Sequence, residues 1–375
     1  METYQDTLEA LNRNLPLGAK LIQTHRVVQK QLPFVARIAI ALYDPKTNLL
    51  KTYLHSSGED DPLPRYHASL NEAPSLANIL KEGRPRVINN MLTFESGEHE
   101  HTRRIGRQGY AASYTMPIFN NGALVGFIFF NSHERDVFTD SVLNQLDVFG
   151  HLISLMVVNE LTAMRTLVAA VTAASHFTHV RDPETGSHID RMSRFARLIA
   201  RELAPRHKLN DDYIEHVFMY APLHDIGKIA IPDRILFKPG RLDAQEGEVM
   251  RGHSRKGREI IDEVLANFGL DAMQHVNILR NIAEHHHEAM NGKGYPAGLK
   301  GVDIPLEARI VAVADVFDAL TSRRPYKDAW TNDEAFATLE RLAGETLDAE
   351  CVQALVRRRE EVESIQAQFD EDRIG

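Results

Sequence analysis

The chain has 375 residues, of which 43% are hydrophobic and 25% charged, values that are ordinary for a globular protein with material for two buried cores. The formal net charge of -9 argues against a protein that coats nucleic acid, because such proteins usually present a basic face. The single cysteine, Cys351, excludes an intrachain disulfide and a thiolate metal site. Without a basic, apolar leader or a long apolar run, we expect a cytoplasmic protein with no membrane contact.

The first part of the chain, residues 1–137, has the pattern of a mixed α/β domain. Its expected elements are a helix over 15–31, strands over 34–43 and 49–56, and strands over 111–119 and 123–131. Asn120-Asn121-Gly122 separates the last two strands and is typical of a tight hairpin. This arrangement resembles a GAF domain, a small antiparallel-sheet sensor fold with helices packed on it. The resemblance implies a regulatory small ligand, whose identity the sequence does not give.

A continuous helix is expected over 140–179, inside a connecting segment that we place at 138–180. Apolar residues recur along it at alternating spacings of four and three, at Val142, Leu146, Phe149, Ile153 and Met156. Two interpretations compete for this stripe. It packs on the domain's own surface, or it joins two subunits as a parallel helix pair that carries a signal between domains. The second is slightly favoured and predicts a homodimer.

From residue 181 to 375 the pattern is almost entirely helical. Candidate helices cover 187–204, 211–224, 244–267, 272–288, 306–322 and 332–343. The charged stretch 357–375 is expected to be a frayed helix. The whole chain is therefore predicted to be an α+β multidomain protein with an all-α C-terminal bundle.

Histidines and acids in this helical part are spaced like metal ligands. They are Glu184, His188, His224, Asp225, His253, His286, His287 and Asp315. Taken singly, most such residues have an ordinary role; Asp315, inside an apolar run, could pair with Arg309 or Arg323, since a buried unpaired carboxylate is costly. As a set without sulfur, they predict a cluster of borderline or hard divalent ions.

Several motifs in this region resemble those of the HD-GYP phosphodiesterases, within the HD superfamily of metal-dependent phosphohydrolases. They are ETGSH at 184–188, HDIGK at 224–228, HHE at 286–288, GKGYP at 292–296 and VADVFDALTSRRPY at 313–326. The resemblance implies hydrolysis of cyclic di-GMP and assigns all eight residues above as ligands of iron or, next, manganese. Glu184 separates three-metal from two-metal sites in that family, which favours three ions here. Two neighbouring ions in such sites activate water and hold the phosphate.

The same resemblance assigns substrate contacts. Asp225 is the natural bridging carboxylate, and Lys228 follows it closely enough to stabilise a phosphate oxygen or protonate the leaving oxygen, unless it is a solvated turn lysine. Tyr295 borders the site. Arg324 and Lys327 match the family's phosphate-contacting basic residues, although Arg323 could exchange roles with Arg324.

At two positions the match to the family motifs is incomplete or ambiguous. Asn291 stands where the family usually has aspartate before the first glycine; Asn-Gly forms turns well, so we expect the loop to persist without that charge. His285 makes three consecutive histidines, and an alternative register would use His285 with His286.

The predicted function is hydrolysis of cyclic di-GMP to pGpG, and further to GMP if a second cleavage follows, regulated by the N-terminal domain. A catalytically weak receptor for the cyclic dinucleotide and a hydrolase of cyclic GMP-AMP are the alternatives. The sequence predicts no nucleic-acid polymer as a partner.

Overall fold

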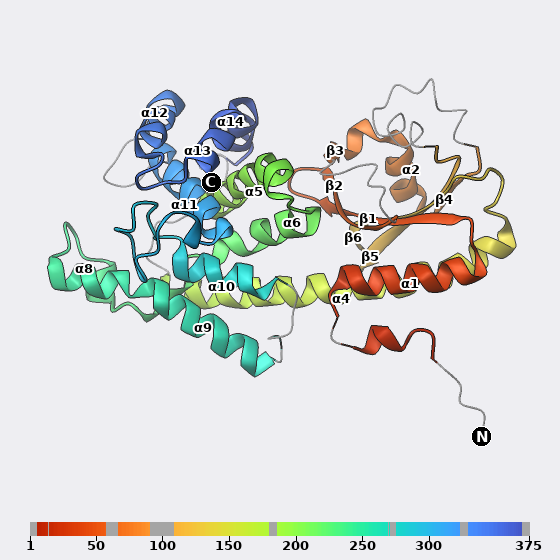
Figure 1. Ribbon diagram of the computed structural model, residues 1–375, viewed down its shortest axis with the longest axis horizontal. Helices are drawn as coiled ribbons and strands as arrows, with labels where there is room; N and C mark the ends of the chain where they lie inside the picture. Colours follow the sequence, from red (N-terminus) through yellow and green to blue (C-terminus); the bar gives the residue numbers. More distant parts are fainter. Residues whose placement is uncertain are drawn as a thin grey trace. The chain divides into compact units, whose positions relative to one another are not determined.

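The computed structural model describes residues 6–13, 15–57, 67–90, 109–179, 186–268, 270, 275–322 and 329–369 (Figure 1). The chain divides into two compact units, Met1–Ala163 and Met164–Gly375. The first holds an antiparallel sheet with helices, and the described part of the second is almost entirely helical. The predicted α+β fold class is confirmed.

The first unit is a six-stranded sheet with the order β3-β2-β1-β6-β5-β4, in which every neighbouring pair is antiparallel. Its elements are η1 (Glu9–Asn12), α1 (Leu17–Gln31), β1 (Val35–Asp44), β2 (Leu49–Ser56), β3 (His67–Ser69), η2 (Leu70–Glu72), α2 (Pro74–Glu82), β4 (Arg86–Ile88), β5 (Ala112–Asn120), β6 (Ala123–Ser132) and the first part of α4 (Asp140–His179). The predicted hairpin joins β5 to β6. Asn121 and Gly122 have φ angles of 49° and 81°, the left-handed pair that a two-residue hairpin turn requires.

Helix α4 packs on the sheet of its own unit. Leu146 and Ile153 are fully buried, and a Cβ atom at Gly150 would lie 2.2 Å from Sδ of Met116. The hydroxyl of Tyr114 donates a hydrogen bond to Asp147. The apolar stripe predicted from the sequence therefore faces the sheet, which the first of its two interpretations requires.

The length and composition of helix α4 bear on the expectation that the protein has no membrane contact. Its stretch Asp140–Thr166 is long and apolar enough to cross a membrane by length and composition. Among the described residues, one helix thus meets this criterion of length and composition. A helix that packs on its own sheet also meets it, and one face of α4 packs in that way.

The second unit consists of short and medium helices. They are α5 (Gly186–His207), α6 (Asp211–Tyr220), η4 (Ala221–Leu223), η5 (Ile226–Ala230), α7 (Asp233–Leu236), α8 (Ala244–Arg251), α9 (His253–Phe268), α10 (Val276–His285), η6 (Gly301–Asp303), α11 (Leu306–Thr321), α12 (Asn332–Leu342), α13 (Ala349–Val356) and α14 (Arg359–Gln368). The helix predicted over 244–267 is two helices, α8 and α9, separated at Gly252.

The described part of the predicted frayed helix, residues 357–369, is instead packed in the bundle, contrary to the sequence prediction. Val362 in α14 is fully buried. The charges that suggested a solvated end instead pair with other helices: Arg358 lies 2.6 Å from Glu202 of α5, and Arg359 contacts Asp333 of α12. Helix α14 is therefore part of the bundle.

Val362→Ala should lower the free energy of unfolding by about 2 kcal/mol, because two buried carbon groups are lost and a cavity remains. Chemical denaturation monitored by circular dichroism would measure the change. Glu363→Ala, at the next and exposed position, is the control and should leave the free energy of unfolding nearly unchanged. Equal effects of the two substitutions would contradict the packing of α14.

Candidate metal centre

Five segments of the second unit bring histidines and acids together. Helix α5 carries His188 near its start, the junction of η4 and η5 carries His224 and Asp225, and α11 carries Asp315. His253 begins α9, while His286 and His287 follow α10. The resulting groups are Asp225 with His253, His286 and His287, and His188 with His224 and Asp315; within each group the potential ligand atoms lie within 4.8 Å of one another. Seven of the eight predicted ligands are thus brought together.

Main-chain carbonyl groups orient three of these imidazoles. In each ring Nδ1 donates to a carbonyl oxygen three or four residues earlier, so the neutral ring presents the lone pair of Nε2 toward the centre. The three bonds join His224 to Ala221 (2.9 Å), His253 to Met250 (2.7 Å) and His286 to Ile282 (2.9 Å).

The carboxylate of Asp225 lies between the two groups. Its Oδ1 is buried, accepts no hydrogen bond, and lies 3.2 Å from Nε2 of His253 and 3.6 Å from Nε2 of His286. Its Oδ2 lies 3.2 Å from Nε2 of His224. Lone pairs that face each other in this way repel unless a cation lies among them. The donor set and its geometry therefore fit divalent ions, with Asp225 reaching both groups.

The pKa shifts of the candidate ligands also favour metal binding. Burial lowers the pKa of His286, and burial together with the neighbouring His286 lowers that of His287 to about 2. Burial would raise the pKa of Asp225, but Lys228 and His224 hold it well below its usual range. At neutral pH the imidazoles of His286 and His287 are thus neutral and the carboxylate of Asp225 is ionised, the forms that bind metals.

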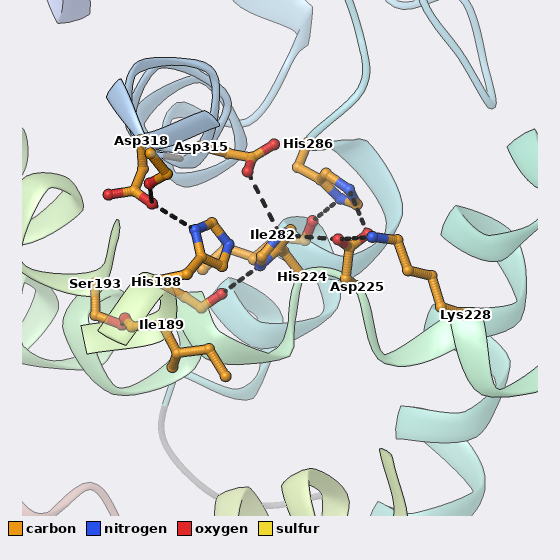
Figure 2. Close-up of polar contacts among 12 residues, drawn as sticks. His188, Ile189, Ser193, His224, Asp225, Lys228, Ile282, His286, Asp315 and Asp318 are labelled. Atoms are coloured by element: carbon orange, nitrogen blue, oxygen red, sulfur yellow. Dashed lines mark hydrogen bonds and ion pairs between the residues drawn. The ribbon is translucent and has the colours of Figure 1, made fainter. Parts of the chain in front are cut away.

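The second group is completed by α11. Figure 2 shows Asp315 and Asp318 extending from one helix toward His224 and His188. Oδ1 of Asp315 lies 3.9 Å from Nε2 of His224. The alternative pairing of Asp315 with Arg309 is wrong, because Arg309 lies 2.5 Å from Asp348.

Asp318 is a positioning residue that the sequence analysis missed. It is fully buried and lies 2.7 Å from Nδ1 of His188, so it fixes the ring with Nε2 toward the centre. Arg191 binds both carboxylate oxygens, at 2.7 and 3.1 Å. Burial would raise the pKa of Asp318, but hydrogen bonds from His188 and Arg191 lower it. The argument applied to Asp315, a carboxylate in an apolar run, would have found Asp318 three residues later.

Gly227 of the HDIGK motif sets the distance between η5 and α9. A Cβ atom there would lie 1.8 Å from the carbonyl oxygen of His253 and 2.4 Å from the backbone nitrogen of Gly257. Only glycine permits this approach. The contact places Asp225 beside His253.

Lys228 and Tyr295 lie at the border of the centre. Nζ of Lys228 is 2.7 Å from Oδ2 of Asp225, so this lysine is ion-paired rather than a solvated turn residue (Figure 2). The ring of Tyr295 lies 4.8 Å from that of His287, and burial raises the pKa of its hydroxyl to about 12. Both side chains can therefore meet a ligand bound at the metals.

The Gly-Tyr-Pro loop persists with Asn291, as predicted. Oδ1 of Asn291 accepts a hydrogen bond from the backbone of Lys293 at 2.9 Å, which forms a local turn. Glu288, a second residue without a predicted role, accepts hydrogen bonds from the backbone of Ala297 (2.7 Å) and Leu299 (2.9 Å) and closes the loop. The HHE motif contained this residue as its third member.

His285 takes a different direction from the two histidines after it. Its nitrogens lie 3.7 and 3.8 Å from the carboxylates of Glu284 and Glu288, and it belongs to neither ligand group. This favours the register with His286 and His287. The other predicted site residues, Glu184, Arg324 and Lys327, and the alternative Arg323, lie outside the described residues.

Asp318→Asn should weaken metal binding by roughly 10- to 100-fold, because the His188 ring loses its charged partner. Metal content after dialysis against a graded chelator would measure this. Asp348→Asn is the matched control: Asp348 is also buried beside an arginine, but it lies in neither ligand group. Equal metal loss in both variants would mean that Asp318 acts only on folding.

Comparisons with known proteins agree with this division of the chain. Residues 179–351 match the HD domain family and residues 24–158 match the GAF domain family. The chain is 48% identical to the cyclic di-GMP phosphodiesterase response regulator RpfG of Xanthomonas campestris over 50% of this chain and 47% of that protein. It is 40% identical to a cyclic di-GMP phosphodiesterase of Thermotoga maritima, over 51% and 50%.

A third relative carries a different substrate name. The 3'3'-cGAMP-specific phosphodiesterase 2 of Vibrio cholerae is 34% identical over 64% of this chain and 47% of its own length. The chain spans about half the length of the curated relatives it matches. The HD domain family implies divalent metal binding, and the His/Asp groups described above lie within the matched residues. Residues 24–158 are thus similar to a GAF domain and residues 179–351 to an HD domain, and the candidate metal centre lies within the second match.

Proposed function

We propose that the HD domain hydrolyses cyclic di-GMP to pGpG and, through a second cleavage, to GMP. The observation that carries this proposal is the position of Asp225 between two groups of imidazoles and carboxylates. Relatives named cyclic di-GMP phosphodiesterases align with this half of the chain and support the substrate class.

The proposed metal content is two or three divalent ions, iron first and manganese next. His188, His224 and Asp315 would hold one ion, and His253, His286 and His287 another, with Asp225 shared between them. Glu184 is the proposed ligand of a third ion. Divalent ions in such a centre supply an activated water and neutralise phosphate charge.

The remaining residues act on the substrate. Lys228, at the border of the centre, would stabilise negative charge on the phosphate or protonate the leaving oxygen. Tyr295 offers an aromatic face and a hydroxyl next to His287. Arg324 and Lys327 are the proposed phosphate contacts.

His286→Ala should abolish most of the hydrolysis of cyclic di-GMP, with a loss of at least about 100-fold, and lower the bound metal, because an inward-facing ligand is removed. The experiment uses protein purified without oxygen, elemental analysis and chromatography of the products. His285→Ala is the neighbouring control and should retain both metal and activity. The register would be refuted if His285→Ala lost metal while His286→Ala kept it.

Two alternatives have distinct outcomes in the same assay. Tight binding of cyclic di-GMP by metal-loaded protein without product would indicate a receptor that signals through protein contacts. Faster turnover of cyclic GMP-AMP than of cyclic di-GMP would indicate the other substrate, the one for which the Vibrio cholerae relative is named.

We further propose that the chain acts in the cytoplasm as a homodimer regulated through its GAF domain by a small ligand that remains unidentified. The proposed parts are a sensor domain over 1–137, a connector over 138–180 and the phosphodiesterase domain over 181–375. Because Leu146 and Ile153 of α4 face the sheet, the dimer contact would use the opposite face. Val148 and Leu155 lie there, seven residues apart and each 68% exposed, the spacing of a two-helix contact.

Leu155→Glu should shift the protein from dimer toward monomer, because a charge would be buried between the two helices. Sedimentation velocity over a range of protein concentrations would measure the shift. Val302→Glu changes another exposed apolar residue, in the second unit, and should leave the dimer intact. A dimer unaffected by Leu155→Glu would exclude this helix face.

A further inference from the structure

A third group of potential ligands lies apart from the metal centre. Asp212 and His216 are four residues apart on α6, and His275 directly precedes α10. Their potential ligand atoms lie within 4.8 Å of one another. Nε2 of His275 is 2.8 Å from Oδ2 of Asp212, and the rings of His216 and His275 lie 4.6 Å apart. None of the three belongs to either group of the catalytic centre.

His216 has the same orientation as the imidazoles of that centre. Its Nδ1 is 2.7 Å from the main-chain carbonyl oxygen of Asp212 and 3.1 Å from Oδ1 of the same residue, so in the neutral form of the ring Nδ1 carries the proton. Nε2 is then a lone-pair acceptor, yet it is buried and no hydrogen-bond donor reaches it. The residue is 1% exposed. A buried acceptor with no donor is costly, and a cation is one group that satisfies it.

The carboxylate of Asp212 supplies the charge that such a cation needs. The residue is 3% exposed. Burial would raise its pKa, but hydrogen bonds from His216 and His275 hold it below its usual range, so it is ionised at neutral pH. Two imidazoles and one carboxylate are a donor set for zinc and similar divalent transition metals, with a fourth position left for water.

We propose that Asp212, His216 and His275 bind one divalent transition-metal ion in a site separate from the catalytic centre. The side chain of His275 is 23% exposed, which provides an entry path from solvent. Imidazole and carboxylate donors bind zinc, so zinc is the probe used here. The same donors also bind other borderline divalent ions.

The position of this site gives the ion a structural role. Helix α6 leads through η4 to His224 and Asp225, and α10 runs from His275 to His286. The two helices contact each other, and α10, with 10 residues, is about 15 Å long. An ion between the start of α6 and the start of α10 would therefore fix the two elements that supply Asp225 and His286 to the catalytic centre.

The test is the number of zinc ions bound by the full chain, measured by equilibrium dialysis and elemental analysis. His275→Asn removes the imidazole and suits the left-handed backbone of this position, where φ is 60°. We expect His275→Asn and His216→Ala each to bind one zinc equivalent fewer than the unchanged chain. His207→Ala is the control: His207 lies 2.8 Å from Glu350, belongs to none of the three groups, and should not change the number.

A double variant separates the two sites. The double variant His275→Asn/His286→Ala should bind one zinc equivalent fewer than His286→Ala alone, because the sites are independent. Unchanged zinc in His275→Asn, or a loss that vanishes in the His286→Ala background, would overturn the proposal and leave a hydrogen-bonded cluster only. His275→Asn decides the question if His216→Ala does not fold. Zinc binding is measured without any substrate, so failure of the proposed hydrolysis would not affect the result.

Discussion

The candidate metal centre depends on hydrogen bonds from imidazole Nδ1 atoms to fixed acceptors. Three rings donate to carbonyl oxygens of their own helices or turns, and His188 pairs with a buried carboxylate. Each hydrogen bond directs the lone pair of Nε2 toward the centre and restricts the rotamers of the side chain. These bonds are made within the protein itself and restrict the rings, which lowers the entropic cost of binding an ion.

This organisation extends from the centre to the end of the chain. Asp318 holds His188 and is itself held by the fork of Arg191, whose remaining nitrogen donates to the carbonyl oxygen of Phe369 at 2.9 Å. Phe369 directly follows α14, the helix that the sequence predicted to be frayed. The ordered C-terminal helix and the orientation of His188, a candidate metal ligand, therefore belong to one network, since a buried arginine needs all of its acceptors.

The sequence predicted those features that local patterns encode, and it failed where distant residues decide. The β5–β6 hairpin was predictable because Asn121-Gly122 requires left-handed backbone wherever it occurs. Spacing and motifs predicted seven candidate ligands that the structure describes, but the contact of Asp318 depends on Arg191, 127 residues earlier in the chain. The apolar stripe of α4 was visible, yet periodicity alone does not distinguish a helix on its own sheet from one in a partner's groove. Likewise, the charges of α14 looked solvated because their partners, such as Glu202, lie far away in the sequence.

The overall negative charge of the chain also bears on the proposed anionic substrate. At the centre, Asp225 and Asp315 carry two negative charges and Lys228 one positive charge, so these three side chains sum to −1. Two divalent ions add four positive charges and reverse the local sign. Affinity for a phosphodiester would then come from the ions and not from the protein's net charge of -9. Divalent ions held by these buried lone pairs would make the centre cationic, so metal binding and substrate binding are expected to be linked.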